Sequence, residues 1–297
     1  MSHSAQVVEV PREATKRAPA PIARWQLAVL ALSAGWIYFP IISKLATQWW
    51  HDPNFSHGFF VPIFSAYVLW DQRHRLASLR PQGSWSGLIL LITAMMILIV
   101  GSLGAELFLA RFSLLVTLAA LVILFLGWSY MRVCSFPWAF LMLMIPIPSI
   151  VFNQVTFPLQ LLASKVGALV LPWLGVPVLR QGNVIQLPAM ALEVAEACSG
   201  IRSLLSLVTL AIIYGYMLER RIIVRVVLAL ASIPIAVAAN SSRIIGTGLL
   251  VQYWDPDKAE GFFHMFSGWL IFVVSLSLLF LVHKTIDRLW KQKRTSA

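Results

Sequence analysis

Residues 87–103 read GLILLITAMMILIVGSL, a run of 17 positions without one charged side chain. A helix needs about 20 predominantly apolar residues to cross the hydrocarbon core of a bilayer. Similar apolar runs follow at about 25–43, 56–70, 112–131, 136–150, 199–217, 222–240 and 264–283. The runs are too continuous for the alternating strands of a barrel, and only helices or closed barrels satisfy the backbone in lipid. We therefore predict an all-α polytopic membrane protein with about eight transmembrane helices.

The charge pattern supports this class and gives it an orientation. The chain of 297 residues is 59% hydrophobic and 12% charged, whereas soluble domains carry about 25% charged residues. The net charge of +11 lies in short loops and in no folded basic domain, which argues against a nucleic-acid partner. The basic loops lie at residues 73–80, 132, 220–225 and 284–294, and they all fall on one side if both termini are cytoplasmic.

The apolar runs and the charge pattern divide the chain into three parts. Residues 1–24 are polar and rich in Pro and Ala, and we expect a disordered cytoplasmic tail leading into an uncleaved signal anchor. Residues 25–283 form a single transmembrane domain, and residues 284–297 form a basic cytoplasmic tail. Cys134 and Cys198 fall on opposite membrane faces, so we expect no disulfide between them.

Residues 153–173 are apolar enough to cross, but an additional crossing would break the parity of the charge pattern. Asn153, Thr156, Gln160 and Ser164 recur at three- and four-residue steps, which predicts one polar stripe on a helix. We interpret this segment as an amphipathic helix at the outer interface or lining a cleft. A true crossing with shifted neighbours is the alternative.

Residues 176–197 predict a short hairpin outside the membrane. Two apolar stretches, 176–180 and 184–187, flank Gln181-Gly182-Asn183, a typical Gly-containing turn. Such a strand pair could hold the loop that carries Cys198, or could offer an edge to an extended peptide.

Three reactive side chains stand at helix boundaries on the predicted outer face: Cys198, Arg243 and His264. A thiol that begins a helix near a guanidinium and an imidazole would have a lowered pKa and act as a nucleophile. Each residue also has a simpler interpretation: a small buried hydrophobe for Cys198, an interfacial arginine for Arg243, and helix capping or packing for His264. Arg243 departs from the charge rule, since the outer loops are otherwise poor in Lys and Arg. No His-x-x-x-His or Cys-x-x-Cys pair occurs here, so we expect no metal and no cofactor.

Supporting polar residues lie near these positions. Arg202 follows Cys198 by one helical turn, and it would be costly inside a membrane helix unless paired, with Glu193 or Glu196 as candidate partners. The segment DPNFSHG (residues 52–58) contains Asp52 and His57 and forms a second polar cluster at the outer face. It could bind substrate, or could cap the following helix through Asn54 or Ser56.

With these residues identified, the chain resembles the exosortase/archaeosortase family of integral-membrane, sortase-like cysteine proteases and transpeptidases. The resemblance lies in EACSGIR (residues 196–202), in Asn240-Ser241-Ser242-Arg243-Ile244, in His264 followed by Gly268, and in the early segment 52–58. It covers roughly residues 25–283. Ordered together at the expected helix boundaries, these motifs are specific, although each alone is weak.

The resemblance implies a site and a substrate class. It implies that Cys198 is the nucleophile and that Arg243 and His264 complete the site, with Glu196, Arg202, Asn240, Asp52 and His57 as supporting or substrate-binding residues. Its partners would be secreted proteins with a C-terminal tripartite (PEP-CTERM type) sorting signal, found with exopolysaccharide genes in Gram-negative bacteria. The enzyme would lie in the bacterial inner membrane, with its active site at the periplasmic face.

Other functions compete with this one. A polytopic transporter or channel could use Arg243 and His264 to handle anions or protons, although no inverted repeat or pair of broken helices supports it. A membrane acyltransferase could use His264 with a carboxylate and would not need Cys198. A noncatalytic scaffold would tolerate replacement of all three residues.

Overall fold

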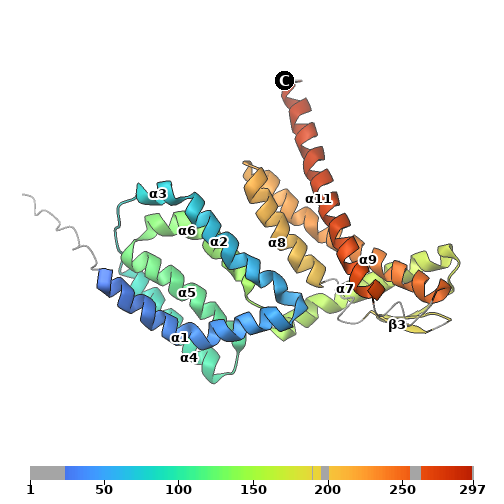
Figure 1. The fold of residues 1–297 in the computed structure, drawn as a ribbon, viewed down its shortest axis with the longest axis horizontal. Coiled ribbons are helices and arrows are strands. Elements are labelled where there is room, and N and C mark those ends of the chain that lie inside the picture. The colour runs from blue at the N-terminus through green and yellow to red at the C-terminus, as the bar shows by residue number, and fades with distance from the viewer. Residues whose placement is uncertain (1–23, 189, 195–200, 255–261, 296–297) are drawn as a thin grey trace, which may run out of the picture.

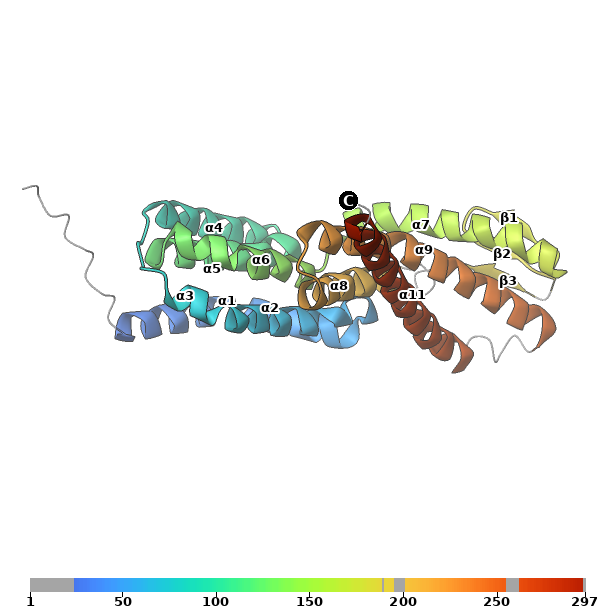
Figure 2. The ribbon, with the colours of Figure 1, turned by 90° about the horizontal axis from the view of Figure 1, so that it is seen from above.

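The computed structural model describes residues 24–188, 190–194, 201–254 and 262–295. The first half contains mainly helices: α1 (Arg24–His51), η1 (Pro53–Phe59), α2 (Phe60–Asp71), α3 (Arg73–Ala77), α4 (Ser86–Leu103), α5 (Leu107–Phe125), α6 (Trp128–Phe140) and η2 (Leu141–Met144). The second half contains α7 (Ser149–Val170), η3 (Leu171–Leu174), β1 (Leu179–Gln181), β2 (Val184–Gln186), β3 (Ala191–Glu193), α8 (Ile201–Leu218), α9 (Ile222–Tyr253) and α11 (Phe262–Thr295). Figures 1 and 2 show α1–α6 grouped in one half of an elongated molecule and α7–α11 in the other.

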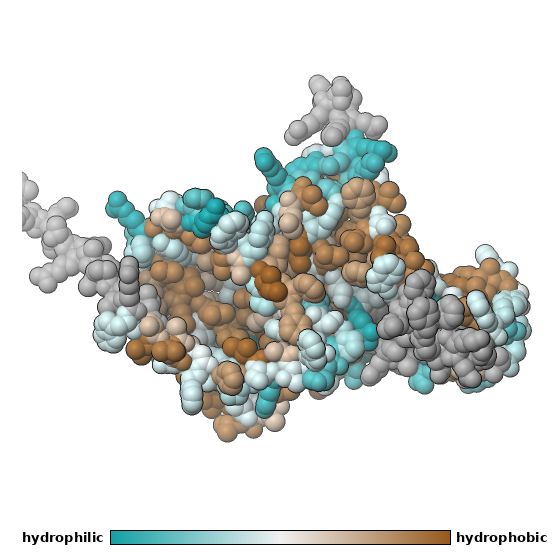
Figure 3. All heavy atoms as spheres, viewed as in Figure 1, coloured by the Kyte–Doolittle hydropathy of each residue, from teal (hydrophilic) through white to brown (hydrophobic). Residues whose placement is uncertain are grey.

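The predicted class, an all-α polytopic membrane protein, is confirmed. Seven helices among the described residues are long and apolar enough to cross a membrane: 28–51, 86–103, 107–125, 149–174, 201–218, 222–253 and 268–290. Large apolar side chains cover their outer surfaces, as Figure 3 shows for one face, and Trp36 and Ile89 are 85% and 68% exposed. Such a surface suits lipid and not water.

The boundaries differ from the predicted crossings in three places. The segment predicted at 56–70 contains the end of η1 and almost all of α2, a helix of only 12 residues. The segment predicted at 136–150 contains only the last part of α6, a helix of 13 residues that begins at Trp128, and then the 3₁₀ helix η2. Residues 149–174, by contrast, qualify as a span. The polar stripe that suggested an interfacial helix is mostly buried in protein contacts, since Thr156, Gln160 and Ser164 are 3%, 8% and 0% exposed. These polar groups therefore give no reason to place α7 in the interface.

The predicted hairpin is present. β1 and β2 pair antiparallel, with Gln181 opposite Val184, so that Gly182 and Asn183 form a two-residue turn. Gly182 has a φ of +65°, a value that favours glycine. A third strand, β3, pairs with β2, although the sequence did not predict it. Ser164 of α7 holds the turn, because its hydroxyl donates to the Gly182 carbonyl at 2.9 Å.

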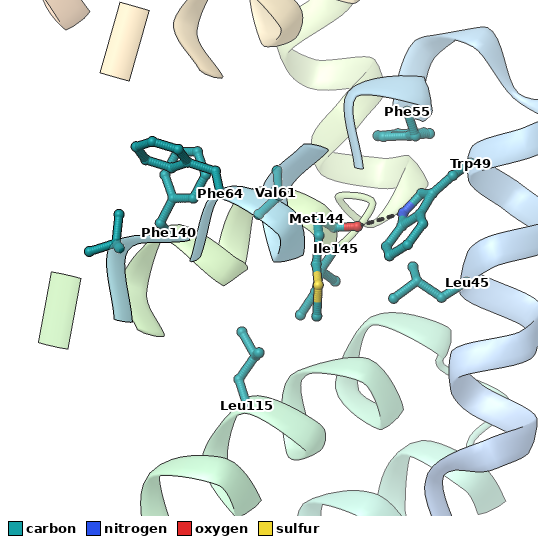
Figure 4. Packing of buried hydrophobic residues seen from close by; sticks show 10 residues of the cluster. Leu45, Trp49, Phe55, Val61, Phe64, Leu115, Phe140, Met144 and Ile145 are labelled. Carbon is teal, nitrogen blue, oxygen red and sulfur yellow. Dashed lines mark hydrogen bonds between the residues drawn. The ribbon is translucent and has the colours of Figure 1, made fainter. Parts of the chain in front are cut away.

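A buried cluster joins η1 and the first helices (Figure 4). Trp49 of α1, Phe55 of η1, Phe64 of α2, Leu115 of α5 and Met144 of η2 are all less than 9% exposed. The Trp49 indole donates from Nε1 to the Met144 carbonyl at 2.9 Å. This packing fixes η1, and therefore His57, against the end of α6 and η2.

The basic loops gather at one end of the molecule. Tyr130 donates to the Leu79 carbonyl at 3.0 Å, which places the loop before α4 beside the start of α6. The Gln72 side chain donates to the Tyr216 hydroxyl at 3.3 Å, which brings the end of α2 to the end of α8. Arg221 forms an ion pair with Asp287 and so joins the α8–α9 turn to the last part of α11. The four basic segments thus share one end, as the charge pattern requires.

The structure covers the two predicted terminal segments to different extents. The expected N-terminal tail falls almost entirely in residues 1–23, outside the described residues. The basic segment after residue 283 continues α11 as far as Thr295.

Candidate functional site

A cavity of about 740 Å³ lies where the two halves of the chain meet. Its walls come from η1 and α2 on one side and from α8, α9 and α11 on the other. The lining residues are Ser56, His57, Phe60, Arg202, Ser203, Ser206, Thr209, Leu210, Ile213, Arg243, Gly268, Trp269 and Phe272. Three predicted site residues, His57, Arg202 and Arg243, therefore share one cavity, although the sequence separates them by up to 186 positions.

The helix α9 carries Arg243 well inside its length, and the prediction that the helix ends near residue 240 is wrong. The hydroxyls of Ser241 and Ser242 donate to the carbonyls of Val237 and Ala238, both at 3.0 Å. Each hydroxyl is thus satisfied one turn back in the same helix, so these polar residues do not terminate it. Asn240 precedes Arg243 by one turn, is 5% exposed and does not line the cavity.

Arg243 reaches the cavity next to α11. A Cβ atom built on Gly268 would lie 3.9 Å from both Cζ and Nη2 of Arg243. The guanidinium of Arg243 therefore lies at van der Waals distance from the position that a side-chain carbon at residue 268 would occupy. Gly268 follows His264 by one helical turn, so the two positions share a face of α11.

One face of α8 is polar and lines the cavity. Arg202 stands at its first turn, and Ser203, Ser206 and Thr209 follow at three-residue steps. Thr209 is only 2% exposed, and its hydroxyl is buried with no hydrogen-bond partner among the described residues. Sequence reasoning missed this stripe, although its regular spacing within an apolar helix was a usable signal.

His57 lines the cavity from η1 and is 7% exposed. Its Nε2 lies 3.2 Å from the Leu143 carbonyl, to which it donates in the Nε2–H tautomer. Burial lowers the pKa of His57, because the charged imidazolium would lose its hydration. At neutral pH the arrangement therefore favours a neutral ring.

Asp52 has a structural role that the sequence left open. Its carboxylate accepts from the Asn54 backbone N–H at 2.9 Å and caps η1. The cap comes from Asp52 itself and not from Asn54 or Ser56, and Asp52 does not line the cavity. Its effect on the site is to hold the segment that presents His57.

The remaining predicted residues are only partly covered by the structure. Cys198 and Glu196 lie outside the described residues, and His264 belongs to α11 by its backbone alone. The described neighbours of Cys198 in the chain are Val194, which follows β3, and Ile201, which begins α8. Arg202 and Ser203, directly after Ile201, line the cavity.

The cavity combines positive charge with an apolar surface. The described lining residues include two arginines and a histidine but no aspartate or glutamate. Phe60, Leu210, Ile213, Trp269 and Phe272 supply apolar walls. Such a site can bind a group that carries or develops negative charge and is attached to an apolar chain.

Comparison of the chain with known proteins gives a family match. The family model of the transmembrane exosortases matches residues 49–281, most of the chain. No curated protein and no solved structure matches the chain.

Proposed function

Because the chain belongs to the transmembrane exosortase family, we propose that it is a cysteine protease or transpeptidase that cleaves the C-terminal sorting signal of secreted proteins. The observation that carries the proposal is the position of the cavity relative to the three predicted catalytic residues. Arg243 lines the cavity, Arg202 lines it four residues after Cys198, and Gly268 lines it four residues after His264. A substrate carbonyl in this cavity would lie near Arg243 and near residues that follow Cys198 and His264 closely in the chain.

The chemistry proceeds in two halves. The Cys198 thiolate attacks the scissile carbonyl and forms a tetrahedral oxyanion, which the Arg243 guanidinium stabilises. The C–N bond then breaks, His264 donates a proton to the leaving amine, and a thioester remains on Cys198. Water or an acceptor amine attacks the thioester and releases the acyl group as a free acid or an amide.

The charge pattern supports an orientation for this reaction. The basic loops share one end of the molecule, and the positive-inside rule assigns that end, with both termini, to the cytoplasm. The cavity-lining residues of α8 and α11 lie toward the ends of these helices that are farther from the basic loops. The active site then faces the periplasm at the outer surface of the bacterial inner membrane, where a secreted substrate with a PEP-CTERM type signal would meet it.

Co-expression with a tagged substrate of this type tests the proposal. The wild type should shorten the substrate, Cys198→Ser should leave it intact, and Cys134→Ser, which removes the other cysteine, should behave as the wild type. Arg243→Gln should reduce processing by about 10²–10³-fold, the usual effect of losing one oxyanion donor.

The intact mass of the shortened product distinguishes hydrolysis from transfer. Equal cleavage of the substrate by Cys198→Ser and by the wild type would refute the thiol mechanism. Failure of every variant, including the wild type, with several such signals would refute the substrate class.

A further inference from the structure

Four charged or titratable side chains gather beyond the cavity, at the end of the molecule that carries the basic loops. Glu219 and Arg221 lie in and next to the α8–α9 turn, and His283 and Asp287 lie one turn apart on α11. From Phe272 to His283, α11 rises about 16 Å at 1.5 Å per residue, so this cluster is separate from the cavity. Nothing in the proposed reaction uses these residues.

The imidazole of His283 is held in one orientation. Its Nδ1 and the Tyr214 hydroxyl share a hydrogen bond of 2.8 Å, and the Tyr214 ring meets the imidazole edge-on. When Nδ1 donates to Tyr214, Nε2 carries the lone pair. A hydrogen bond of this kind on the far nitrogen is a regular companion of metal-binding histidines.

The Nε2 atom of His283 faces two carboxylates at an unusual distance. It lies 3.6 Å from Oε2 of Glu219 and 3.7 Å from Oδ2 of Asp287, and it is buried with no hydrogen bond to the part of the chain that the structure describes. Both separations are too long for a hydrogen bond. A lone pair on Nε2 that faces two carboxylate oxygens is repulsive, so either a proton on Nε2 or a metal ion must stand between the imidazole and the carboxylates. Two ligands bound to one tetrahedral zinc ion at about 2.0–2.1 Å lie roughly 3.3 Å apart, close to the spacing found here.

Arg221 binds both carboxylates: it donates to both oxygens of Glu219 and to Oδ1 of Asp287, so that Oδ2 of Asp287 receives no bond from it. Its guanidinium donates to Glu219 through Nε at 3.0 Å and through Nη2 at 2.6 Å, and Nη2 also donates to Oδ1 of Asp287. Oδ2 of Asp287 is left facing the imidazole. These bonds with Arg221 also hold the pKa of Glu219 at about 2, so its carboxylate is ionised and able to bind a cation.

We propose that Glu219, His283 and Asp287 bind one divalent transition-metal ion, with Zn²⁺ as the best match. The three donor atoms lie within 4.8 Å of one another, and one imidazole nitrogen with two carboxylate oxygens is a donor set that zinc accepts. Arg221 acts as the outer partner that orients both carboxylates. The ion fastens α11 to the α8–α9 turn, and water completes its coordination.

Metal binding to the full-length protein in detergent tests the proposal, after treatment with a chelator. The wild type should take up one equivalent of Zn²⁺, measured by competition with a chromophoric chelator, and should unfold at a higher temperature when saturated. Co²⁺ in its place should give the visible absorption of a four-coordinate site. Asp287→Asn, which keeps the side-chain shape, and His283→Asn should both weaken binding at least about tenfold.

The control is His74→Asn, which changes an exposed histidine in another basic loop and should bind as the wild type does. Equal zinc binding by wild type and by both Asp287→Asn and His283→Asn would overturn the proposal. It would also be overturned if zinc had no effect while acidification stabilised the wild type but not His283→Asn, because the species at Nε2 would then be a proton only. Neither result depends on whether the chain cleaves a peptide.

Discussion

Replacement of Gly58 by alanine should test how η1 is held next to the cavity. A Cβ atom at this position would lie 2.4 Å from Nε1 and 2.5 Å from Cδ1 of the Trp49 indole. The indole cannot retreat freely, because Trp49 is 8% exposed, packs edge-on against Phe59 at 5.2 Å and donates to the Met144 carbonyl.

The expected loss of folding free energy in Gly58→Ala has two parts. Overpacking of a filled core costs about 1–3 kcal/mol. Displacement of the indole from Met144 adds roughly 1 kcal/mol for the lost hydrogen bond. Gly58→Ala should therefore destabilise the protein by about 2–4 kcal/mol, which lowers the unfolding temperature by several degrees.

Gly35→Ala is the matched control, because Gly35 lies inside α1 with nothing within 4 Å of the added methyl group. It should be neutral or stabilising by up to about 1 kcal/mol, the helix propensity of alanine over glycine. Thermal unfolding in detergent compares the two variants. If Gly58→Ala unfolds at the temperature of Gly35→Ala, the indole does not lie against residue 58 and the packing argument is refuted. In a Trp49→Leu background the penalty of Gly58→Ala should shrink, which assigns it to the indole.

Two further predictions concern buried polar groups. Thr209→Val keeps the side-chain shape and removes a buried hydroxyl for which the described residues supply no hydrogen-bond partner, so it should stabilise the protein by about 1–2 kcal/mol. A lower unfolding temperature would mean that the hydroxyl is bonded. Glu219 has a pKa lowered to about 2, mainly by its hydrogen bond with Arg221, so the ionised carboxylate stabilises the fold fully above pH 4.5 and loses this effect as the pH falls toward 2. Glu219→Gln should be less stable at neutral pH and should show a flatter loss of stability between pH 4.5 and 2, and unfolding curves that stay parallel to the wild type over this range would contradict the assignment.

The sequence predicts the helices better than their ends. Uninterrupted apolar runs such as 87–103 match α4 within one residue, because no polar group there offers an alternative ending. The end of α9 was misplaced, since Ser241 and Ser242 look like a loop but donate to carbonyls of their own helix. The strand β3 was missed because three residues carry no readable alternation.

The sequence identifies individual residues of the cavity but does not predict that they line one cavity together. Arg202 stood out because a charge inside a membrane helix is costly unless it is paired, and Arg243 because the outer loops are otherwise poor in Lys and Arg. The approach of α11 to Arg243, with Gly268 beside the guanidinium, is a fact about packing that no local pattern encodes. The pairing of Arg221 with Asp287, 66 positions apart, depends in the same way on how α11 crosses the α8–α9 turn.

The cavity draws its walls from both ends of the chain, and this sets the order in which it can form during synthesis. His57 leaves the ribosome early, whereas Phe272 follows more than 200 residues later. At about 5–20 residues per second, this interval lasts roughly 10–40 s. Until α11 is inserted, a nascent chain has no enclosed pocket around the segment that follows Cys198. The cavity therefore forms only after α11 has been synthesised, and truncated products from interrupted synthesis lack the cavity in which the proposed reaction takes place.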